Sequence, residues 1–205
     1  KADFIEILRY AADRHIRVVP EIETPGHARA AVVSMKARYE RLMKEGKKEA
    51  AEEYMLHDPN DRSVYRSVQG WRDNAMNVAL PSVYRFLGRV LDDFIALYKE
   101  AGVPFTMVHV GGDELPAGVW EKSPIAQELI AREPGLHKTE DLWYYYYEKV
   151  NQLLKERGLQ AYGWEEAGMR KTMLDGKPHY IPNPDFAKGF FQLDVWNNML
   201  GWGAE

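Results

Sequence analysis

Two adjacent carboxylates, Asp113 and Glu114, follow a pair of glycines at the end of an apolar run. Side chains alternate between the two faces of a regular strand, so these neighbours can serve one pocket only where the backbone bends, as Gly111 and Gly112 permit. Paired carboxyl groups in different environments are suited to acid–base catalysis. The four residues could instead form a turn with a helix N-cap. The buried-strand composition of residues 105–110 favours the catalytic interpretation.

The composition indicates one sizeable core and no strong charge bias. The 205 residues are 45% hydrophobic and carry a formal net charge of −4, which argues against a nucleic-acid partner. The lysines of residues 44–48 alternate with glutamate, as on a solvated helix face. Cysteine is absent, which excludes disulfides and thiolate metal sites. No apolar run approaches the length of a membrane span.

Apolar periodicity predicts helices that alternate with short strands. The predicted helices cover residues 3–12, 28–48, 81–101 and 140–157. The predicted strands cover residues 16–22, 105–110, 159–164 and 190–196. Residues 57–80 show no clean period, and we interpret them as a long surface excursion of a single domain spanning residues 1–205. The order implies parallel strands with crossover helices, in either an open doubly wound sheet or part of an eight-stranded barrel.

Residues that could do chemistry follow the carboxyl ends of all four predicted strands. They are Glu21, Glu23 and His27, then Asp113 and Glu114, then Trp164 and Glu165, then Trp196 and Asn197. In a (β/α)₈ barrel these strand ends form the single face that carries catalysis. Because no glycine-rich phosphate loop follows any strand, an open nucleotide-binding sheet is disfavoured. We therefore expect an α/β fold that is part of a (β/α)₈ TIM barrel.

Four motifs stand at these strand ends: PEIETPGH at residues 20–27, HVGGDE at 109–114, GWEE at 163–166 and VWNN at 195–198. Together they resemble the glycoside hydrolase family 20 β-N-acetylhexosaminidases, over nearly the whole chain. The resemblance implies that the chain supplies about strands three to six of the barrel, with their helices. It also implies that this segment alone is inactive, because the family's early-strand arginine and late-strand tyrosine and tryptophan lie outside it.

The resemblance implies hydrolysis of terminal β-linked N-acetylglucosamine or N-acetylgalactosamine, with the sugar's own acetamido oxygen as the nucleophile and net retention. Glu114 would protonate the leaving oxygen and later activate water, so it must hold a proton in the resting enzyme. Asp113 would stay charged and orient the acetamido nitrogen. His27 would tune the acid, although a structural histidine bound to a loop carbonyl is a competing explanation. Trp164 and Trp196 would form walls around the sugar, although simple packing is a competing explanation for both.

Two further residues complete the expected substrate-binding set. Asn197 would donate a hydrogen bond to the sugar or a loop, and His109 would support the site from beneath. Glu21, Glu23 and Glu165 are expected to tie loops together, and most of the aromatic residues 143–147 are expected to pack against the barrel or its neighbours. We expect no metal and no cofactor. The expected partner is a glycan with a terminal N-acetylhexosamine; the oligomeric state stays open, and the resemblance suggests a periplasmic or secreted protein.

Three other functions fit some of the residues. A retaining glycosidase could use Glu165 as a protein nucleophile opposite Glu114. A non-catalytic sugar-binding fragment could keep the pocket without turnover. A metal-dependent barrel hydrolase would draw its ligands from Glu21, Glu23, His27, His109 and Asp113. The paired histidine spacing of such metal sites is missing from the sequence, which disfavours this last alternative.

Overall fold

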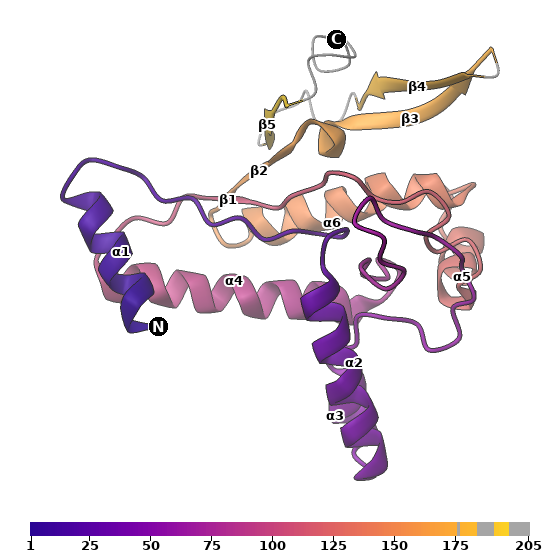
Figure 1. Ribbon diagram of the computed structural model, residues 1–205, viewed down its shortest axis with the longest axis horizontal. Helices are drawn as coiled ribbons and strands as arrows, with labels where there is room; N and C mark the ends of the chain where they lie inside the picture. Colours follow the sequence, from indigo (N-terminus) through magenta and orange to yellow (C-terminus); the bar gives the residue numbers. More distant parts are fainter. Residues whose placement is uncertain (176, 184–190, 197–205) are drawn as a thin grey trace.

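The computed structural model describes residues 1–175, 177–183 and 191–196 (Figure 1). The described helices are α1 (Ala2–Ala12), α2 (Arg29–Lys44), α3 (Lys48–Glu52), α4 (Pro81–Ala101), α5 (Pro124–Arg132) and α6 (Leu142–Lys155), with 3₁₀ turns η1 (Thr139–Asp141) and η2 (Glu165–Gly168). The described strands are β1 (Met107–His109), β2 (Gln160–Trp164), β3 (Met169–Leu174), β4 (Lys177–Pro182) and β5 (Phe191–Asp194).

Three parallel strands lie in the order β1-β2-β5 and position the polar residues that follow them. On the other side of β1, Glu21 forms a single parallel bridge with His109. The first, second, third and fourth predicted strands are therefore neighbours in chain order and all run the same way. This is the arrangement of consecutive strands in a (β/α)₈ barrel, and it places their carboxyl ends on one edge.

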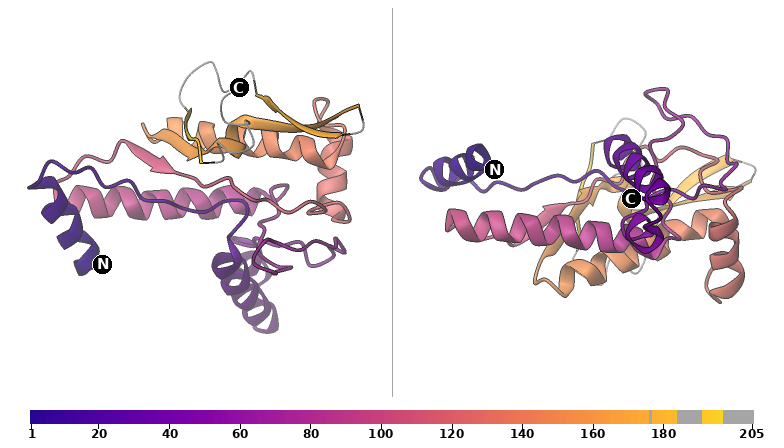
Figure 2. Two further views of the ribbon diagram at one scale, coloured as in Figure 1. Left: turned by 45° about the horizontal axis from the view of Figure 1, so that its top comes forward. Right: turned by 90° about the horizontal axis from the view of Figure 1, so that it is seen from below.

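The two long helices α4 and α6 lie side by side along one face of the strands (Figures 1 and 2). Helix α4 begins with Pro81 at its first turn and ends at Gly102, whose φ of 74° forms a left-handed cap. Its apolar stripe is buried beside the wholly buried strand residues Val108 and Ala161. Both helices were predicted from their apolar period, and both predictions are confirmed.

Three local predictions differ from the structure. Residues 16–22 form one bridge rather than a strand; Pro20 has no N–H to donate, and Ile16 is exposed. The predicted helix 28–48 ends at Lys44, and α3 follows it as a separate short helix. Between β2 and β5 the described residues form the antiparallel hairpin β3–β4 instead of a crossover helix. Helix α5 was not predicted.

Residues 57–80 contain neither helix nor strand, and only their middle part lies at the surface. Val64 and Val68 are exposed, whereas Met76 and Val78 belong to the main core. The segment is anchored at its beginning by Asp58, whose Oδ2 accepts a 2.7 Å hydrogen bond from Ser123 Oγ. Of the helices described, none is both long and apolar enough to span a membrane.

Candidate active site

The double glycine bends the chain sharply after β1. Gly111 and Gly112 have φ of 71° and 110°, in a region that favours glycine. A Cβ on Gly112 would lie 2.5 Å from the Tyr147 hydroxyl, and one on Gly111 would overlap the Glu23 carboxyl group. Glu114 itself has a positive φ of 48°. The bend turns both adjacent carboxylates to one side, as the sequence predicted.

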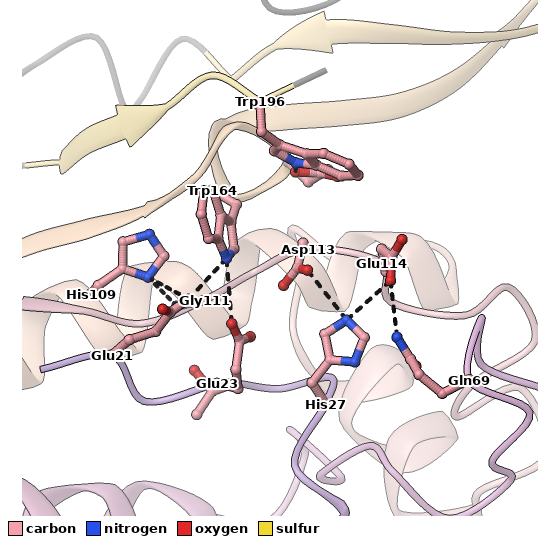
Figure 3. Close-up of polar contacts among 12 residues, drawn as sticks. Glu21, Glu23, His27, Gln69, His109, Gly111, Asp113, Glu114, Trp164 and Trp196 are labelled. Carbon is pink, nitrogen blue, oxygen red and sulfur yellow. Dashed lines mark hydrogen bonds and ion pairs between the residues drawn. The ribbon is translucent and has the colours of Figure 1, made fainter.

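His27 brings the two carboxylates together (Figure 3). Its Nε2 lies 3.3 Å from Asp113 Oδ2 and 3.4 Å from Glu114 Oε2. The segment that carries His27 is fixed against the end of β1 because Thr24 Oγ1 donates a 2.7 Å hydrogen bond to the Val110 carbonyl. Asp113, Glu114 and His27 therefore share one environment, and all three are only partly exposed.

Gln69 is a further polar contact of the acid, and the sequence analysis missed it. Its Nε2 donates a 3.2 Å hydrogen bond to Glu114 Oε2, the same oxygen that faces His27. Gln69 lies in the irregular segment 57–80, where no periodicity marks a side chain as facing the site. Glu114 Oε2 is thus held by two neighbours, which leaves Oε1 as the oxygen able to exchange a proton with a substrate.

Trp164, the last residue of β2, is held by two glutamates. Its indole Nε1 donates to Glu21 Oε1 at 3.0 Å and to Glu23 Oε1 at 3.3 Å. These bonds tie the residues after the first predicted strand to β2, as expected for the two glutamates. Burial, followed by the neighbouring carboxyl groups of Glu21 and Asp113, raises the pKa of Glu23 to about 9.

His109 is the last residue of β1, and among the described contacts no hydrogen bond or ion pair joins it to Asp113 or Glu114. Its Nδ1 accepts a 3.2 Å hydrogen bond from the Gly111 N–H, and its ring meets the Trp164 ring edge-on at 4.8 Å between centroids. Burial lowers the pKa of His109 and so favours the neutral ring. His109 supports the glycine bend and the tryptophan, in keeping with its expected place beneath the site; contact with sugar stays a prediction.

Trp196, just after β5, lies on the same side of the site as Trp164 (Figure 3). Its Nε1 donates a 3.0 Å hydrogen bond to Glu166 Oε2, and its side chain remains 47% exposed. Burial raises the pKa of Glu166. Asn197, the remaining expected sugar-binding residue, lies outside the described residues.

A cavity of about 460 Å³ opens beside Glu114 and Trp196. Two aromatic residues at the start of α6, Trp143 and Tyr144, line it, whereas Tyr146 and Tyr147 are fully buried. Most of the aromatic run was expected to pack, and none of it was assigned to the site. Its members point in different directions around the helix, and only the structure shows which of them reach the cavity.

The comparisons with known proteins agree with this geometry. The family model described as "Glycosyl hydrolase family 20, catalytic domain" matches residues 1–201. The chain belongs to glycoside hydrolase family 20. A β-hexosaminidase of Vibrio vulnificus is 38% identical over 205 residues, and an N,N'-diacetylchitobiase of Vibrio harveyi is 51% identical over 234 residues. Both alignments cover 100% of this chain but only 23% and 25% of those relatives.

Solved family 20 structures resemble the described fold as well. An exo β-N-acetylglucosaminidase of Vibrio harveyi in complex with N-acetylglucosamine gives a TM-score of 0.67 at 33% identity, covering 82% of this chain and 22% of that one. A β-N-acetylhexosaminidase of Bacteroides fragilis gives 0.61 at 27% identity, covering 94% and 30%. The family 20 chain is thus one part of a (β/α)₈ barrel, as predicted.

The site geometry also bears on the alternatives. Glu165, the candidate protein nucleophile, is 2% exposed and does not line the cavity beside Glu114. A nucleophile must reach the anomeric carbon, so its burial disfavours that role. Polar atoms of His27, Asp113 and Glu114 lie within 4.8 Å of one another. Hydrogen bonding accounts for this approach, and Glu21, Glu23 and His109 lie outside that group.

Proposed function

We propose that the protein carrying this chain hydrolyses terminal β-linked N-acetylglucosamine or N-acetylgalactosamine residues. The observation that carries the proposal is the position of His27 Nε2, 3.3 Å from Asp113 and 3.4 Å from Glu114, beside Trp164 and Trp196. The names of the relatives point to the same class of sugar: a chitobiase, and an N-acetylglucosaminidase solved with N-acetylglucosamine. Because the chain spans about a quarter of its curated relatives, activity is proposed for the protein rather than for this segment.

The chemistry needs one acid and one permanent anion at adjacent positions. Glu114 protonates the glycosidic oxygen while the acetamido oxygen of the substrate attacks the anomeric carbon, giving an oxazolinium intermediate. Asp113 receives the acetamido N–H and stabilises the positive charge that develops there. Glu114, now ionised, takes a proton from water, which opens the intermediate with net retention. The cavity beside Glu114 offers space for the leaving group.

The acidic surroundings of the site support this mechanism. Glu21 and Asp113 are the acidic groups near Trp164, whereas burial favours the neutral forms of Glu23 and His109. A negative environment stabilises a cationic transition state, and it would repel a phosphorylated or carboxylated substrate. A neutral amino sugar is the substrate class that fits.

Substitution of the two carboxylates tests the proposal in the protein that carries the complete barrel. Glu114→Gln and Asp113→Asn should each lower kcat for an N-acetylglucosaminide by about 100-fold or more, since each removes a group that acts on the reacting atoms. Glu165→Gln is the control for a protein nucleophile and should retain far more activity. If neither Glu114→Gln nor Asp113→Asn slowed turnover, the proposed roles would be wrong.

Substrate and metal dependence separate the remaining alternatives. Aryl N-acetylglucosaminide should be cleaved and the matching glucoside should not, because the glucoside lacks the internal nucleophile. Equal rates on both would favour a protein nucleophile. Loss of activity with a chelator, restored by a divalent ion, would favour a metal-dependent hydrolase. Residues 1–205 alone should show no turnover, and sugar binding without hydrolysis by the complete barrel would indicate a binding module.

A further inference from the structure

Beneath the acid pair lies another carboxyl group that the proposed mechanism does not use. Glu23 Oε1 accepts the Trp164 indole N–H at 3.3 Å. Its other oxygen, Oε2, is buried and has no hydrogen-bond partner in the described part of the chain, and the same holds for Asp113 Oδ1. Asp113 Oδ2 faces His27 at 3.3 Å. Two neighbouring carboxyl groups therefore each present a buried oxygen to which no N–H or hydroxyl group of residues 1–175, 177–183 or 191–196 donates.

The position of Glu23 is fixed by close packing. A Cβ on Gly111 would lie 3.0 Å from Glu23 Cα and 2.8 Å from its Cδ, so the Glu23 carboxyl occupies space that only glycine at position 111 leaves free. Tyr147 stands nearby, and its hydroxyl donates to the Thr24 carbonyl at 3.3 Å. The side chain of Glu23 is consequently held in place and cannot turn out to water without disturbing the bend before Asp113.

Among the residues that the structure describes, the groups that face Glu23 provide no positive charge to pair with an anion. They are the carboxyl groups of Glu21 and Asp113, the Trp164 indole and the Tyr147 phenol. Two carboxylates cannot hydrogen-bond to each other unless one of them holds a proton. A buried anion without a cation is strongly unfavourable. The proton therefore belongs on the carboxyl group that does not face a histidine. That group belongs to Glu23.

We propose that Glu23 is a neutral carboxylic acid that donates its proton in a hydrogen bond to Asp113 Oδ1. This inference rests on the proposed function and deepens it. The bond fixes the Asp113 carboxylate with Oδ2 toward His27 and leaves the negative charge on Asp113, where the acetamido N–H must be received. Glu23 acts through Asp113 and is a positioning residue. Its neutral state also avoids placing a further negative charge directly beside Asp113.

Two variants of the complete protein separate a neutral donor from a carboxylate. In Glu23→Gln the amide N–H can donate to Asp113 while the amide oxygen accepts from Trp164, so kcat should stay within about threefold of wild type near neutral pH. Glu23→Met keeps the length but has no donor. Its kcat should fall about tenfold, equivalent to ~1.4 kcal/mol, with KM changed far less, because orientation matters at the attack step. Thermal unfolding establishes that both variants fold.

The protonation state itself can be measured without turnover. In infrared difference spectra near pH 7, wild type minus Glu23→Gln should show the carbonyl band of a protonated carboxyl group. Glu49→Gln, at an exposed position of helix α3, provides the baseline and should show loss of a carboxylate band instead. Absence of the protonated band would overturn the inference, as would a Glu23→Gln variant as slow as Glu23→Met or a Glu23→Met variant as fast as wild type.

These readouts also distinguish the inference from the proposed function. A wild-type protein that shows the protonated band but cleaves no N-acetylhexosaminide would refute the function and leave the neutral Glu23 standing. A wild-type protein that cleaves the substrate but lacks the band would refute the neutral Glu23 and leave the function standing.

Discussion

Substitution of Gly112 by alanine is the sharpest test of how the bend builds the site. The new Cβ would lie 2.5 Å from the Tyr147 hydroxyl and 2.9 Å from Ala167 Cβ, and Tyr147 and Ala167 are both fully buried. Neither neighbour can move away cheaply. The backbone at φ 110° adds a second penalty for any residue with a side chain.

The overpacking and the positive φ together set the expected loss of unfolding free energy. An alanine forced into the positive-φ region costs about 1–2 kcal/mol, and overpacking a filled interior costs about 1–3 kcal/mol more, so Gly112→Ala should lower the free energy of unfolding by ~2–5 kcal/mol. That is a large share of the ~5–15 kcal/mol of a typical domain. Because Asp113 and Glu114 follow directly, a shift of about 1 Å there should also lower kcat about 100-fold.

Gly102→Ala is the matched control. Gly102 has a positive φ of 74°, yet a Cβ there would meet no atom of the described residues within 4 Å. The free energy of unfolding of Gly102→Ala should therefore fall by only the backbone contribution of about 1–2 kcal/mol, and its kcat should not change. Urea unfolding and kcat, measured on the complete protein well below the melting temperature, give both quantities. Adding Tyr147→Phe to Gly112→Ala should restore part of the stability, because it removes the closest atom. Equal costs for Gly112→Ala and Gly102→Ala would refute the reasoning.

Three further predictions concern the contacts around the acid pair. Trp164→Phe removes the indole donor to Glu21 and Glu23 and should cost about 1–2 kcal/mol of unfolding free energy by urea titration; no change would mean that these bonds contribute nothing. Gln69→Ala removes one donor to Glu114 Oε2 and should lower kcat by up to about tenfold at nearly constant KM; a rise in KM alone would place Gln69 in substrate binding instead. The raised pKa of Glu23, from 4.5 to about 9, means that across this window the folded state holds a proton which the unfolded state has lost, so stability falls as pH rises. We therefore expect the difference in melting temperature, Glu23→Gln minus wild type, to rise by ~2 °C or more between about pH 5 and about pH 9. A difference that does not change with pH would contradict the raised pKa of Glu23.

The predicted parts of the fold are those with a strong local signal. Helix α4 has an apolar stripe along its whole length, proline at its first turn and glycine at its end, so sequence and structure agree on its bounds. The segment 16–22 has the composition of a strand, but pairing depends on neighbours and on Pro20, which cannot donate. Hairpin β3–β4 stands where a crossover helix was expected, and topology rules alone did not anticipate it.

The site residues also divide into those with a local signal in the sequence and those without one. Asp113 and Glu114 were predicted because they follow a buried strand and a double glycine, whereas the role of His27 came from the resemblance to the family. The structure places His27 Nε2 3.3 Å from Asp113 and 3.4 Å from Glu114. Gln69 was not predicted because it lies in an irregular segment. Contacts made from such a segment, like its hydrogen bond to Glu114, produce no periodic pattern in the sequence. The close relation of Glu23 to Asp113 was missed for a similar reason: it depends on the space left free by a glycine.

His27 and Glu114 share one backbone property, positive φ values of 47° and 48° in residues that are not glycine. Each such residue stores about 1–3 kcal/mol of strain that the surrounding packing must offset. The protein is therefore expected to resist heat better once these residues are exchanged for glycine, although catalysis is lost. Selection for thermal resistance alone would erode this active site, and its retention would require selection for the reaction.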